Sequence, residues 1–180
     1  MAESKLELSE LSFDELNINE NLLRGIYGYG FEKPSMIQHK AIPVLSSGKD
    51  VIAQAQSGTG KTGAFSIGSL CNVDETLKNT QILVLSPTRE LAEQTFQVMK
   101  ELASYTEISF CKVVGGTRVS DCVNDLRKDP QVIVGTPGRI LDMLYKKHLF
   151  TDKLKTVIID EADEMLSQGF QEMIHNIFQC

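Results

Sequence analysis

The sequence has no tryptophan, few aromatic residues and no long hydrophobic run. Aromatic side chains occupy 7% of its 180 positions, and no apolar stretch approaches the roughly 18 residues that a membrane-spanning helix needs. The first segment, residues 1–8, is too acidic for a secretory signal peptide. We therefore expect a soluble, intracellular protein with no membrane partner, located in the cytoplasm, with the nucleus as the alternative location.

Paired metal ligands are also missing. The four cysteines and three histidines are scattered along the chain, whereas a structural zinc site needs ligands in closely spaced pairs. We interpret the cysteines as reduced core or terminal residues and the histidines as surface or helix residues. They are Cys71, Cys111, Cys122 and Cys180, and His39, His148 and His175.

Basic charge is scarce as well. The formal net charge is −6 and the isoelectric point is near 5.1, so the excess of lysine and arginine that usually marks a nucleic-acid-binding protein is absent. If nucleic acid binds to this chain, few phosphates are neutralised. The contacts must then come mainly from backbone amides and hydroxyl groups at particular loops.

What the sequence does contain is a regular alternation of short apolar runs and amphipathic segments. With 42% hydrophobic residues, the chain can bury one substantial core, which predicts a single domain. The alternation predicts an α/β fold with three layers, a parallel sheet with helices on both faces. The expected strands lie near residues 50–55, 81–86, 108–114, 131–135 and 154–160, and the expected helices near 20–29, 35–46, 61–71, 88–103, 118–127, 137–147 and 163–178.

The segment after the first expected strand has the composition of a phosphate-binding loop. Gly58 and Gly60 permit a tight turn that aims backbone N–H groups inward. Lys61 supplies a cation for the β and γ phosphates, and the Thr62 hydroxyl suits Mg²⁺. The sequence therefore predicts a site for a magnesium nucleotide, against the alternative of a glycine-rich turn with a solvated lysine. Its residues are Ala55, Gln56, Ser57, Gly58, Thr59, Gly60, Lys61 and Thr62, with Ala55 where the pattern usually has glycine.

An acidic tetrapeptide, residues 160–163, follows the last expected strand. The carboxyl end of a strand is where open α/β sheets bind ligands. We expect Asp160 to accept a hydrogen bond from a magnesium-bound water and Glu161 to orient or deprotonate the water that attacks the γ phosphate. The alternative is an acidic first helical turn that the helix dipole favours. Because the same sequence also contains a phosphate-binding loop, we favour the first interpretation. Glu161 and Asp160 are then a catalytic pair that acts with Lys61.

Three strand-to-helix junctions share a further pattern of Thr, Arg and Gly or Pro. Each lies at the predicted carboxyl edge of the sheet and offers free N–H groups, a hydroxyl and a guanidinium, which suits an anion. A single junction of this kind is most simply an ordinary helix cap. Three of them on one edge predict a nucleic-acid backbone, bound single-stranded and without base readout because no aromatic stacking platform exists. The residues are Pro87, Thr88, Arg89, Gly115, Gly116, Thr136, Pro137, Gly138 and Arg139.

From Phe13 to Phe178 the chain resembles the first RecA-like domain of a DEAD-box RNA helicase. The segment Gly30–Gln38 is similar to the family's adenine-reading motif, and the segments around Arg89, Gly116 and Arg139 are similar to its RNA-contacting motifs. The resemblance implies ATP and Mg²⁺ as cofactors. It also implies that Gln38 hydrogen-bonds adenine, that Phe31 stacks on the base with Phe13 as the isolated upstream aromatic, and that Lys33 belongs to the same nucleotide site.

The resemblance is narrower to the translation initiation factor 4A subgroup, through residues 13–16, 22–27 and 160–167. It implies an RNA-stimulated ATPase in which ATP and RNA clamp two domains together, the RNA is bent, and hydrolysis resets the clamp. Implied partners are single-stranded RNA, held through its backbone, a second RecA-like domain and initiation-factor scaffold proteins. The alternatives are a non-catalytic, nucleotide-gated RNA clamp and a P-loop phosphotransferase, although no acceptor pocket for the latter is evident.

Parts of the family pattern are not in this sequence. The resemblance implies that a Ser-Ala-Thr motif and a second domain with γ-phosphate arginines follow Cys180, and that Asp163 couples the nucleotide site to them. We therefore expect residues 1–48, a helical segment with the adenine-reading motif, and residues 49–180 to form one RecA-like domain that is incomplete at its C-terminus. We expect a vacant strand position between residues 51–53 and 157–159, low stability or self-association, and little ATP hydrolysis by this chain alone.

Overall fold

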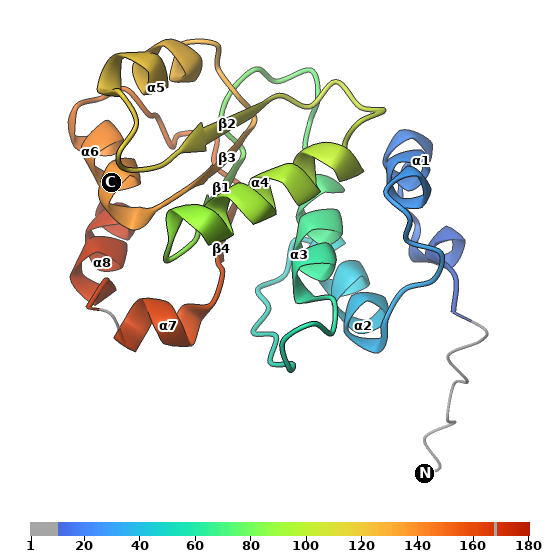
Figure 1. The fold of residues 1–180 in the computed structure, drawn as a ribbon. Coiled ribbons are helices and arrows are strands. Elements are labelled where there is room, and N and C mark those ends of the chain that lie inside the picture. Colours follow the sequence, from blue (N-terminus) through green and yellow to red (C-terminus); the bar gives the residue numbers. More distant parts are fainter. Residues whose placement is uncertain (1–10, 168) are drawn as a thin grey trace. The chain divides into compact units, whose positions relative to one another are not determined.

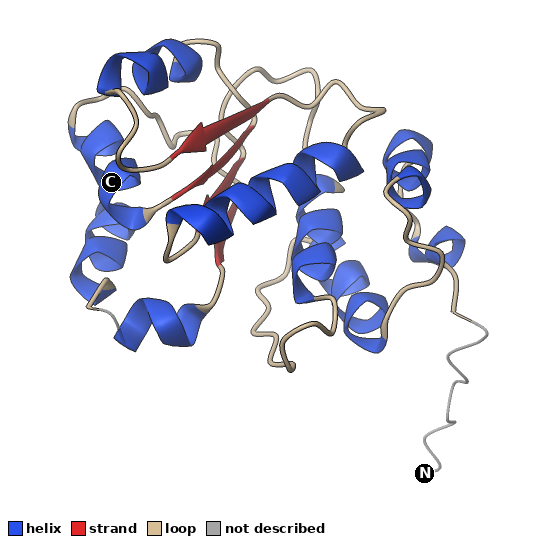
Figure 2. Cartoon of the chain, viewed as in Figure 1, coloured by secondary structure: helices blue, strands red, loops and turns tan. Residues whose placement is uncertain are grey.

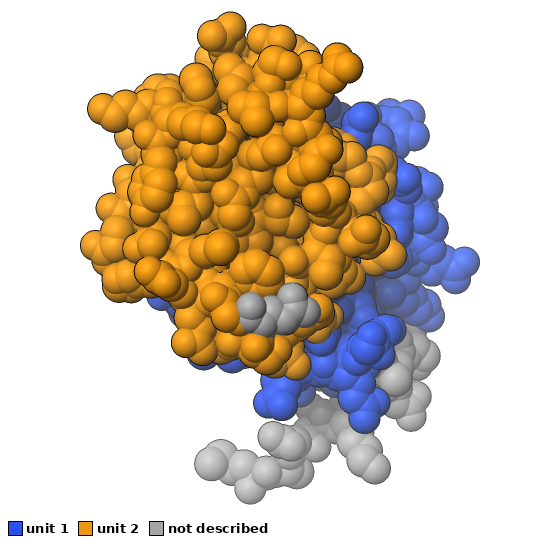
Figure 3. All heavy atoms as spheres, turned by 60° about the vertical axis from the view of Figure 1, so that its left-hand side comes forward, with its two compact units in different colours: residues 1–72, 98–106 blue, residues 73–97, 107–180 orange. Residues whose placement is uncertain are grey.

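The structure is a computed structural model that describes residues 11–167 and 169–180 (Figure 1). The chain divides into two compact units (Figure 3). Unit 1 contains the residues up to Asn72 together with Val98–Thr106, and unit 2 contains Val73–Gln97 and Glu107–Cys180. The predicted division at residues 48 and 49 stays a prediction. The elements are η2 (Phe13–Leu16), α1 (Glu20–Gly28), α2 (Met36–Ser46), α3 (Lys61–Leu70), β1 (Ile82–Leu85), α4 (Arg89–Leu102), β2 (Phe110–Val113), α5 (Val119–Leu126), β3 (Val132–Gly135), α6 (Pro137–Tyr145), β4 (Thr156–Ile159), α7 (Ala162–Ser167) and α8 (Gln171–Gln179).

Unit 2 is built on a sheet of four parallel strands in the order β2-β3-β1-β4 (Figure 2). All residues of β1 and β3 are buried, as the apolar runs without alternation predict for strands that are covered on both faces. The register sets Leu85, the last residue of β1, beside Gly135 of β3 and Ile159 of β4. Consequently three strands end at one edge, where the chain turns into the loops that carry the predicted site residues.

Helices cover both faces of this sheet, which confirms the predicted α/β class. On one face, Leu83 and Leu85 of β1 join a hydrophobic cluster with side chains from α5, α6, α7 and α8, and Figure 1 shows α5, α6 and α8 gathered on that side. The other face of the sheet packs against the first part of α4. There the ring of Phe96 contacts that of Phe110 with centroids 6.4 Å apart, and Glu93 forms an ion pair with Lys112.

Unit 1 is helical. Its helices α1 and α2 are capped by the side chains of Asn19 and Ser35. Small residues determine how closely the helices pack. A Cβ at Gly68 in α3 would lie 2.6 Å from the Cβ of Leu45 in α2, so these helices touch where glycine leaves room. Likewise Gly25 in α1 lies directly against the backbone of the last residue of α4, Leu102. Throughout the described part of the chain, no helix combines the length and hydrophobicity that crossing a membrane would require.

Two sequence predictions are wrong. Residues 50–55 were expected as a strand, but they form no ladder with any described strand, and the Ile52 side chain is fully exposed at 102%. A strand persists only where its N–H and C=O groups find a neighbour, and the sheet formed by the described residues contains only β1 to β4. The expected helix at 163–178 is instead α7 and α8, because Gly169 adopts a left-handed φ of 78° that ends the first helix.

The contact between Gly25 and Leu102 leads to the first prediction. A Cβ at Gly25 would lie 1.8 Å from the Leu102 carbonyl oxygen, and a backbone atom cannot move aside cheaply. Gly25→Ala should therefore lower the free energy of unfolding by about 1–3 kcal/mol or more, as overpacking typically does. The measurement is urea-induced unfolding followed by circular dichroism.

Gly28→Ala is the matched control in the same helix. Its Cβ would lie 3.5 Å from the Tyr105 ring, an ordinary contact, and alanine favours a helix over glycine by about 1 kcal/mol. This variant should be as stable as the parent or more so. Equal destabilisation of the two variants would contradict the close packing of α1 against the end of α4.

Candidate functional site

The predicted phosphate-binding loop lies in unit 1, and its last two residues, Lys61 and Thr62, are the first two residues of α3. Gly58 and Gly60 have φ angles of 79° and 96°, a left-handed conformation that glycine adopts without a steric penalty. Gly60 is the N-cap of α3, and no side chain caps this helix. The N–H groups of its first turn are therefore available to an anion, with Lys61 and Thr62 at the helix start. Within the loop, the Thr59 hydroxyl donates to the Gln56 carbonyl at 2.7 Å.

Gln38 and Phe31, which the resemblance implies as adenine contacts, lie against this loop. The Gln38 side chain is 3% exposed, and its Nε2 donates to the Gly60 carbonyl at 3.3 Å. A Cβ at Gly63 would lie 2.6 Å from the Gln38 Nε2 and 3.0 Å from the Phe31 ring. The Gln38 Oε1 also accepts from the Ser35 N–H at 2.9 Å, which completes a capping box at the start of α2. Unit 1 therefore brings Phe31, Gln38 and the loop together.

Phe13 is part of the same cluster, but it is fully buried. Its ring stacks on that of Phe31, with centroids 6.2 Å apart and planes 19° apart. The ring of Tyr29 contacts that of Phe31 edge-on, with ring centroids 4.9 Å apart. Phe13 thus supports one face of Phe31 instead of offering its own ring to a ligand. Lys33 is exposed on the same connection.

The acidic residues lie in unit 2, where β4 ends. The Asp160 N–H donates to the Leu85 carbonyl at 2.9 Å, which extends the ladder by one residue. Glu161 then takes a positive φ of 48°, a conformation that costs a non-glycine residue on the order of 1–3 kcal/mol. Its N–H donates to the Asp160 carboxylate at 3.0 Å. The chain turns sharply here, and Asp163 falls in the first turn of α7.

A buried threonine that the sequence analysis missed holds the other oxygen of this carboxylate. Thr95 in α4 is 3% exposed, and its hydroxyl donates to the Asp160 Oδ2 at 3.4 Å. The available signal was a polar residue on the apolar stripe of α4, between Ala92 and Met99, both of which are fully buried. A polar residue on such a stripe needs a partner inside the protein.

The three predicted anion-binding junctions meet at one hollow in unit 2, with a volume of about 690 Å³. Its walls come from the loops after β1, β2 and β3, from the start of α4, and from α6 and α8. The predicted residues Gly116 and Pro137 are not among the lining residues, but both adjoin residues that are. The hollow is lined by Pro87, Thr88, Arg89, Glu90, Gly115, Thr136, Gly138, Arg139, Asp142, Phe170 and Met173.

Short contacts hold these three loops in place. The Arg89 guanidinium lies over Gly116, where a Cβ would come within 2.1 Å of its Nη1. Arg139 donates from Nη2 to the Thr117 carbonyl at 3.0 Å. The Thr136 hydroxyl accepts from the Gly115 N–H at 3.3 Å. Both arginines are therefore positioned by the loop that follows β2.

The alternative interpretation of these junctions as ordinary caps holds for one helix and fails for another. At α4, the Thr88 hydroxyl accepts from the Leu91 N–H at 3.2 Å, which is a cap bond. At α6, Thr136 occupies the N-cap but makes no cap bond, because its hydroxyl is used by the loop after β2. The first turn of α6, with Pro137 at its start, therefore keeps N–H groups for an anion.

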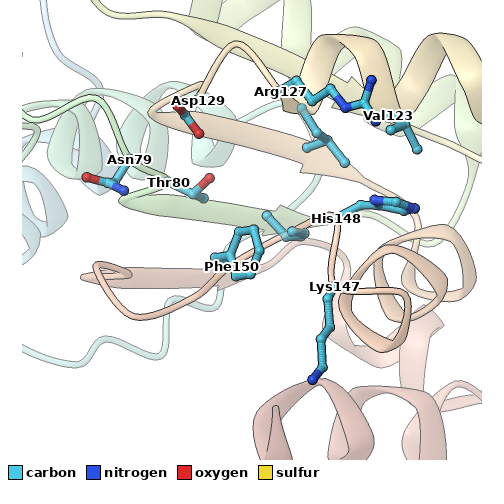
Figure 4. A pocket seen from close by; sticks show the side chains of 10 residues that line it. Asn79, Thr80, Val123, Arg127, Asp129, Lys147, His148 and Phe150 are labelled. Atoms are coloured by element: carbon cyan, nitrogen blue, oxygen red, sulfur yellow. The ribbon is translucent and has the colours of Figure 1, made fainter.

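A second hollow of about 310 Å³ lies near the start of β1 and β3, at the other edge of the sheet (Figure 4). Figure 4 shows Thr80 and Asp129 on one side of the Phe150 ring and His148 on the other, with the Lys147 side chain pointing away from them. No residue of the predicted site lies there. The basic residues Arg127 and Lys147 and the acidic residue Asp129 line it together. The hollow therefore favours neither anions nor cations.

The residues predicted to hold Mg²⁺ offer hard oxygen atoms, namely the Thr62 hydroxyl in unit 1 and the Asp160 carboxylate in unit 2. Oxygen donors of this kind suit Mg²⁺, which retains most of its water ligands. In the described ranges, 11–167 and 169–180, no three His, Cys, Asp or Glu side chains gather as a metal site. Each of these two groups, taken by itself, is of the chemical type that Mg²⁺ prefers.

Comparison with known proteins gives one consistent result. The family model described as DEAD/DEAH box helicase matches residues 35–180. The chain is 54% identical over 168 residues to the ATP-dependent RNA helicase eIF4A of Aspergillus niger, which is 93% of this chain and 42% of that protein. It is 52% identical over 177 residues to the protein of the same name from Chaetomium globosum, which is 98% of this chain and 45% of that protein.

Solved structures agree with these sequence matches. A DEAD box protein from Methanococcus jannaschii superposes with a TM-score of 0.89 at 38% identity, over 94% of this chain and 46% of that one. Dbp5 of S. cerevisiae, bound to RNA and ADP BeF3, superposes with a TM-score of 0.86 at 40% identity, over 93% of this chain and 43% of that one. The chain therefore spans less than half the length of the relatives it matches.

The contact of Arg89 with Gly116 leads to a prediction about RNA. Gly116 has a φ of 81°, and a Cβ there would meet the Arg89 guanidinium. Gly116→Ala should displace this guanidinium and weaken binding of a single-stranded oligonucleotide about tenfold, the equivalent of about 1.4 kcal/mol. Fluorescence anisotropy with a labelled RNA measures this. Gly115→Ala is the comparison within the same loop, since it adds a methyl group to the same hollow but its Cβ would lie no closer than 3.8 Å to Arg89. Equal affinities of the two variants would place Arg89 outside the RNA site.

Proposed function

The chain belongs to the DEAD/DEAH box helicase family, and on that premise we propose that it is the first domain of an ATP-dependent RNA helicase of the translation initiation factor 4A type. The observation that carries the RNA part is the convergence of three loops on one hollow at the carboxyl edge of the sheet. The same edge carries Asp160 and Glu161, one strand further on. ATP turnover and RNA binding are thereby assigned to neighbouring loops of one sheet.

The nucleotide is assigned to the phosphate-binding loop and to the acidic residues after β4. Lys61 and the uncapped N–H groups of α3 bind the phosphates, and the Gln38–Phe31 cluster beside the loop recognises the adenine base. Mg²⁺, when bound, neutralises phosphate charge. Thr62 and Asp160 supply oxygen atoms to it. Glu161 orients the attacking water, and its presence favours turnover over a purely structural, nucleotide-gated clamp.

RNA is assigned to the hollow through its sugar-phosphate backbone. Two cations, Arg89 and Arg139, and two anions, Glu90 and Asp142, line the same hollow, so the net electrostatic attraction is small. Recognition then depends on N–H groups and hydroxyls in fixed positions, which read the backbone and not the base sequence. The S. cerevisiae Dbp5 structure bound to RNA and ADP BeF3 supports this assignment by similarity.

The remaining partners follow from the same premise. The relatives are about twice as long as this chain, and we assign to their further length a second RecA-like domain that closes on ATP and RNA. Asp163 is the residue proposed to couple the two domains. Scaffold proteins of translation initiation are proposed as partners, and the cytoplasm as the location.

The nucleotide assignment predicts the effect of removing the Lys61 cation. Lys61→Ala should abolish most ATP binding, because the phosphates lose their principal side-chain partner, whereas Glu161→Gln should leave the affinity unchanged. Isothermal titration calorimetry with ATP and Mg²⁺ measures both. Lys49→Ala is the charge-matched control, since Lys49 is exposed in the same unit and outside the loop. Equal ATP affinity of the parent and of Lys61→Ala would contradict the phosphate-binding assignment.

The RNA assignment predicts a shallow dependence on salt. The logarithm of the association constant should fall with the logarithm of salt concentration by about 0.7 per neutralised phosphate, with only a few phosphates involved. Arg89→Ala and Arg139→Ala should weaken binding of all RNA sequences alike and reduce this slope. Arg127→Ala is the control, because Arg127 lines the hollow at the opposite edge. A steep slope, or a loss confined to one RNA sequence, would identify a different surface.

A further inference from the structure

We propose that Thr95 and Ser86 are positioning residues for Asp160, which fix the direction in which its carboxylate faces Mg²⁺ and the nucleotide. This inference rests on the proposed function, because it assigns a second layer of residues to the same site. It concerns two side chains of unit 2 to which the sequence analysis assigned no role.

Strand register places Ser86 beside Asp160. Leu85 pairs with Ile159, and the Asp160 N–H donates to the Leu85 carbonyl, so the next residues of the two strands, Ser86 and Asp160, are also neighbours. Adjacent strands lie about 4.8 Å apart. Side chains alternate along a strand, and Leu85 and Ile159 both point into the hydrophobic cluster under α6 and α8. Ser86 and Asp160 therefore share the opposite face, where α4 packs.

Thr95 reaches Asp160 from that helix. Its hydroxyl donates to Oδ2 at 3.4 Å, while the Glu161 N–H donates to Oδ1 at 3.0 Å. Both carboxylate oxygens thus have a donor, one from α4 and one from the turn into α7. A carboxylate held at both oxygens has a defined plane, which is the requirement for a group that must meet a cation in one direction.

Ser86 is the unexplained member of this cluster. It is fully buried, and its Oγ has no hydrogen-bond partner, although buried hydroxyls in native proteins nearly always have one. The preceding residues on the same face of β1, Ile82 and Val84, are apolar, so a hydroxyl adds nothing to packing there. Its position beside Asp160 lets it become a further donor to this carboxylate when Mg²⁺ is bound. We therefore assign the Ser86 hydroxyl to the ligand-bound state.

The experiment measures how much Mg²⁺ strengthens nucleotide binding. ATP affinity of the 180-residue chain is determined by calorimetry in excess Mg²⁺ and in EDTA, and the ratio of the two is compared among variants. Thr95→Val, which has the same shape without a hydroxyl, should reduce this ratio about 5- to 10-fold, as expected for one hydrogen bond to a charged group. Thr95→Ser, which keeps the hydroxyl, should have the same ratio as the parent chain. Affinity in EDTA should not change.

Ser86→Ala gives a signature that a structural role cannot produce. Removal of an unpaired buried hydroxyl should raise the thermal unfolding midpoint of the nucleotide-free chain or leave it unchanged, while the Mg²⁺ ratio falls. Thr80→Val is the control, because Thr80 is also buried in unit 2 but donates to the Pro130 carbonyl at 3.0 Å, at the other edge of the sheet. It should lower the midpoint and leave the Mg²⁺ ratio unchanged.

The outcomes separate this inference from the proposed function. If the parent chain binds ATP no better in Mg²⁺ than in EDTA, the proposed function itself is wrong. If the parent shows the Mg²⁺ effect and Thr95→Val and Ser86→Ala retain it in full, only the positioning role is wrong. If Thr95→Val fails to fold, Thr95→Ser and Ser86→Ala still decide the question through the same ratio.

Discussion

The parallel ladder of β1 is the constraint on which the rest of unit 2 depends. This strand is fully buried and hydrogen-bonds to β3 on one side and β4 on the other. Its pairing brings the ends of β1, β3 and β4 to one edge, and β2 ends beside β3 in the same register. Because every strand is parallel, each helix returns the chain to the opposite edge, and every strand delivers its following loop to the same place.

Side-chain contacts join the loops at that edge to one another. Arg89 lies over Gly116, Arg139 donates to Thr117, and Thr136 accepts from Gly115. These contacts restrict the arginine side chains before any ligand binds, which lowers the entropy lost on binding. An acidic chain with few cations attracts RNA weakly without specific contacts, so such preorganisation is the physical basis of the RNA binding that we propose.

Two unfavourable local features of unit 2 lie beside Asp160. Glu161 has a left-handed backbone, and the Ser86 hydroxyl is buried without a partner. Each of these lowers the stability of the folded chain, and each lies within one residue or one strand spacing of the carboxylate. Strained and unsatisfied groups of this kind persist where a ligand uses them. Their location is consistent with a site whose favourable geometry is completed by Mg²⁺ and nucleotide.

Local sequence signals were sufficient for several features. The apolar runs at 82–85 and 132–134 predicted strands covered on both faces, and the glycines before Lys61 predicted the turn that starts α3; the structure has both. These predictions succeed because the determining residues are adjacent in the chain. The division of the region 163–178 into two helices was also encoded locally, by Gly169, but the periodicity of the flanking residues concealed it.

Only the tertiary structure decided the features that depend on distant partners. Residues 50–55 have the composition of a strand, yet they form none with the described strands, because a strand requires a neighbouring backbone that composition cannot supply. Thr136 has the sequence of a helix cap, but its hydroxyl is taken by Gly115. Thr95 is an ordinary helix residue until folding sets it beside Asp160, which is 65 residues later in the chain. The sequence by itself determined the segments whose signals are local, such as β1, β3 and the start of α3, whereas tertiary hydrogen bonding decided whether a strand-like segment pairs and which polar side chains surround the site.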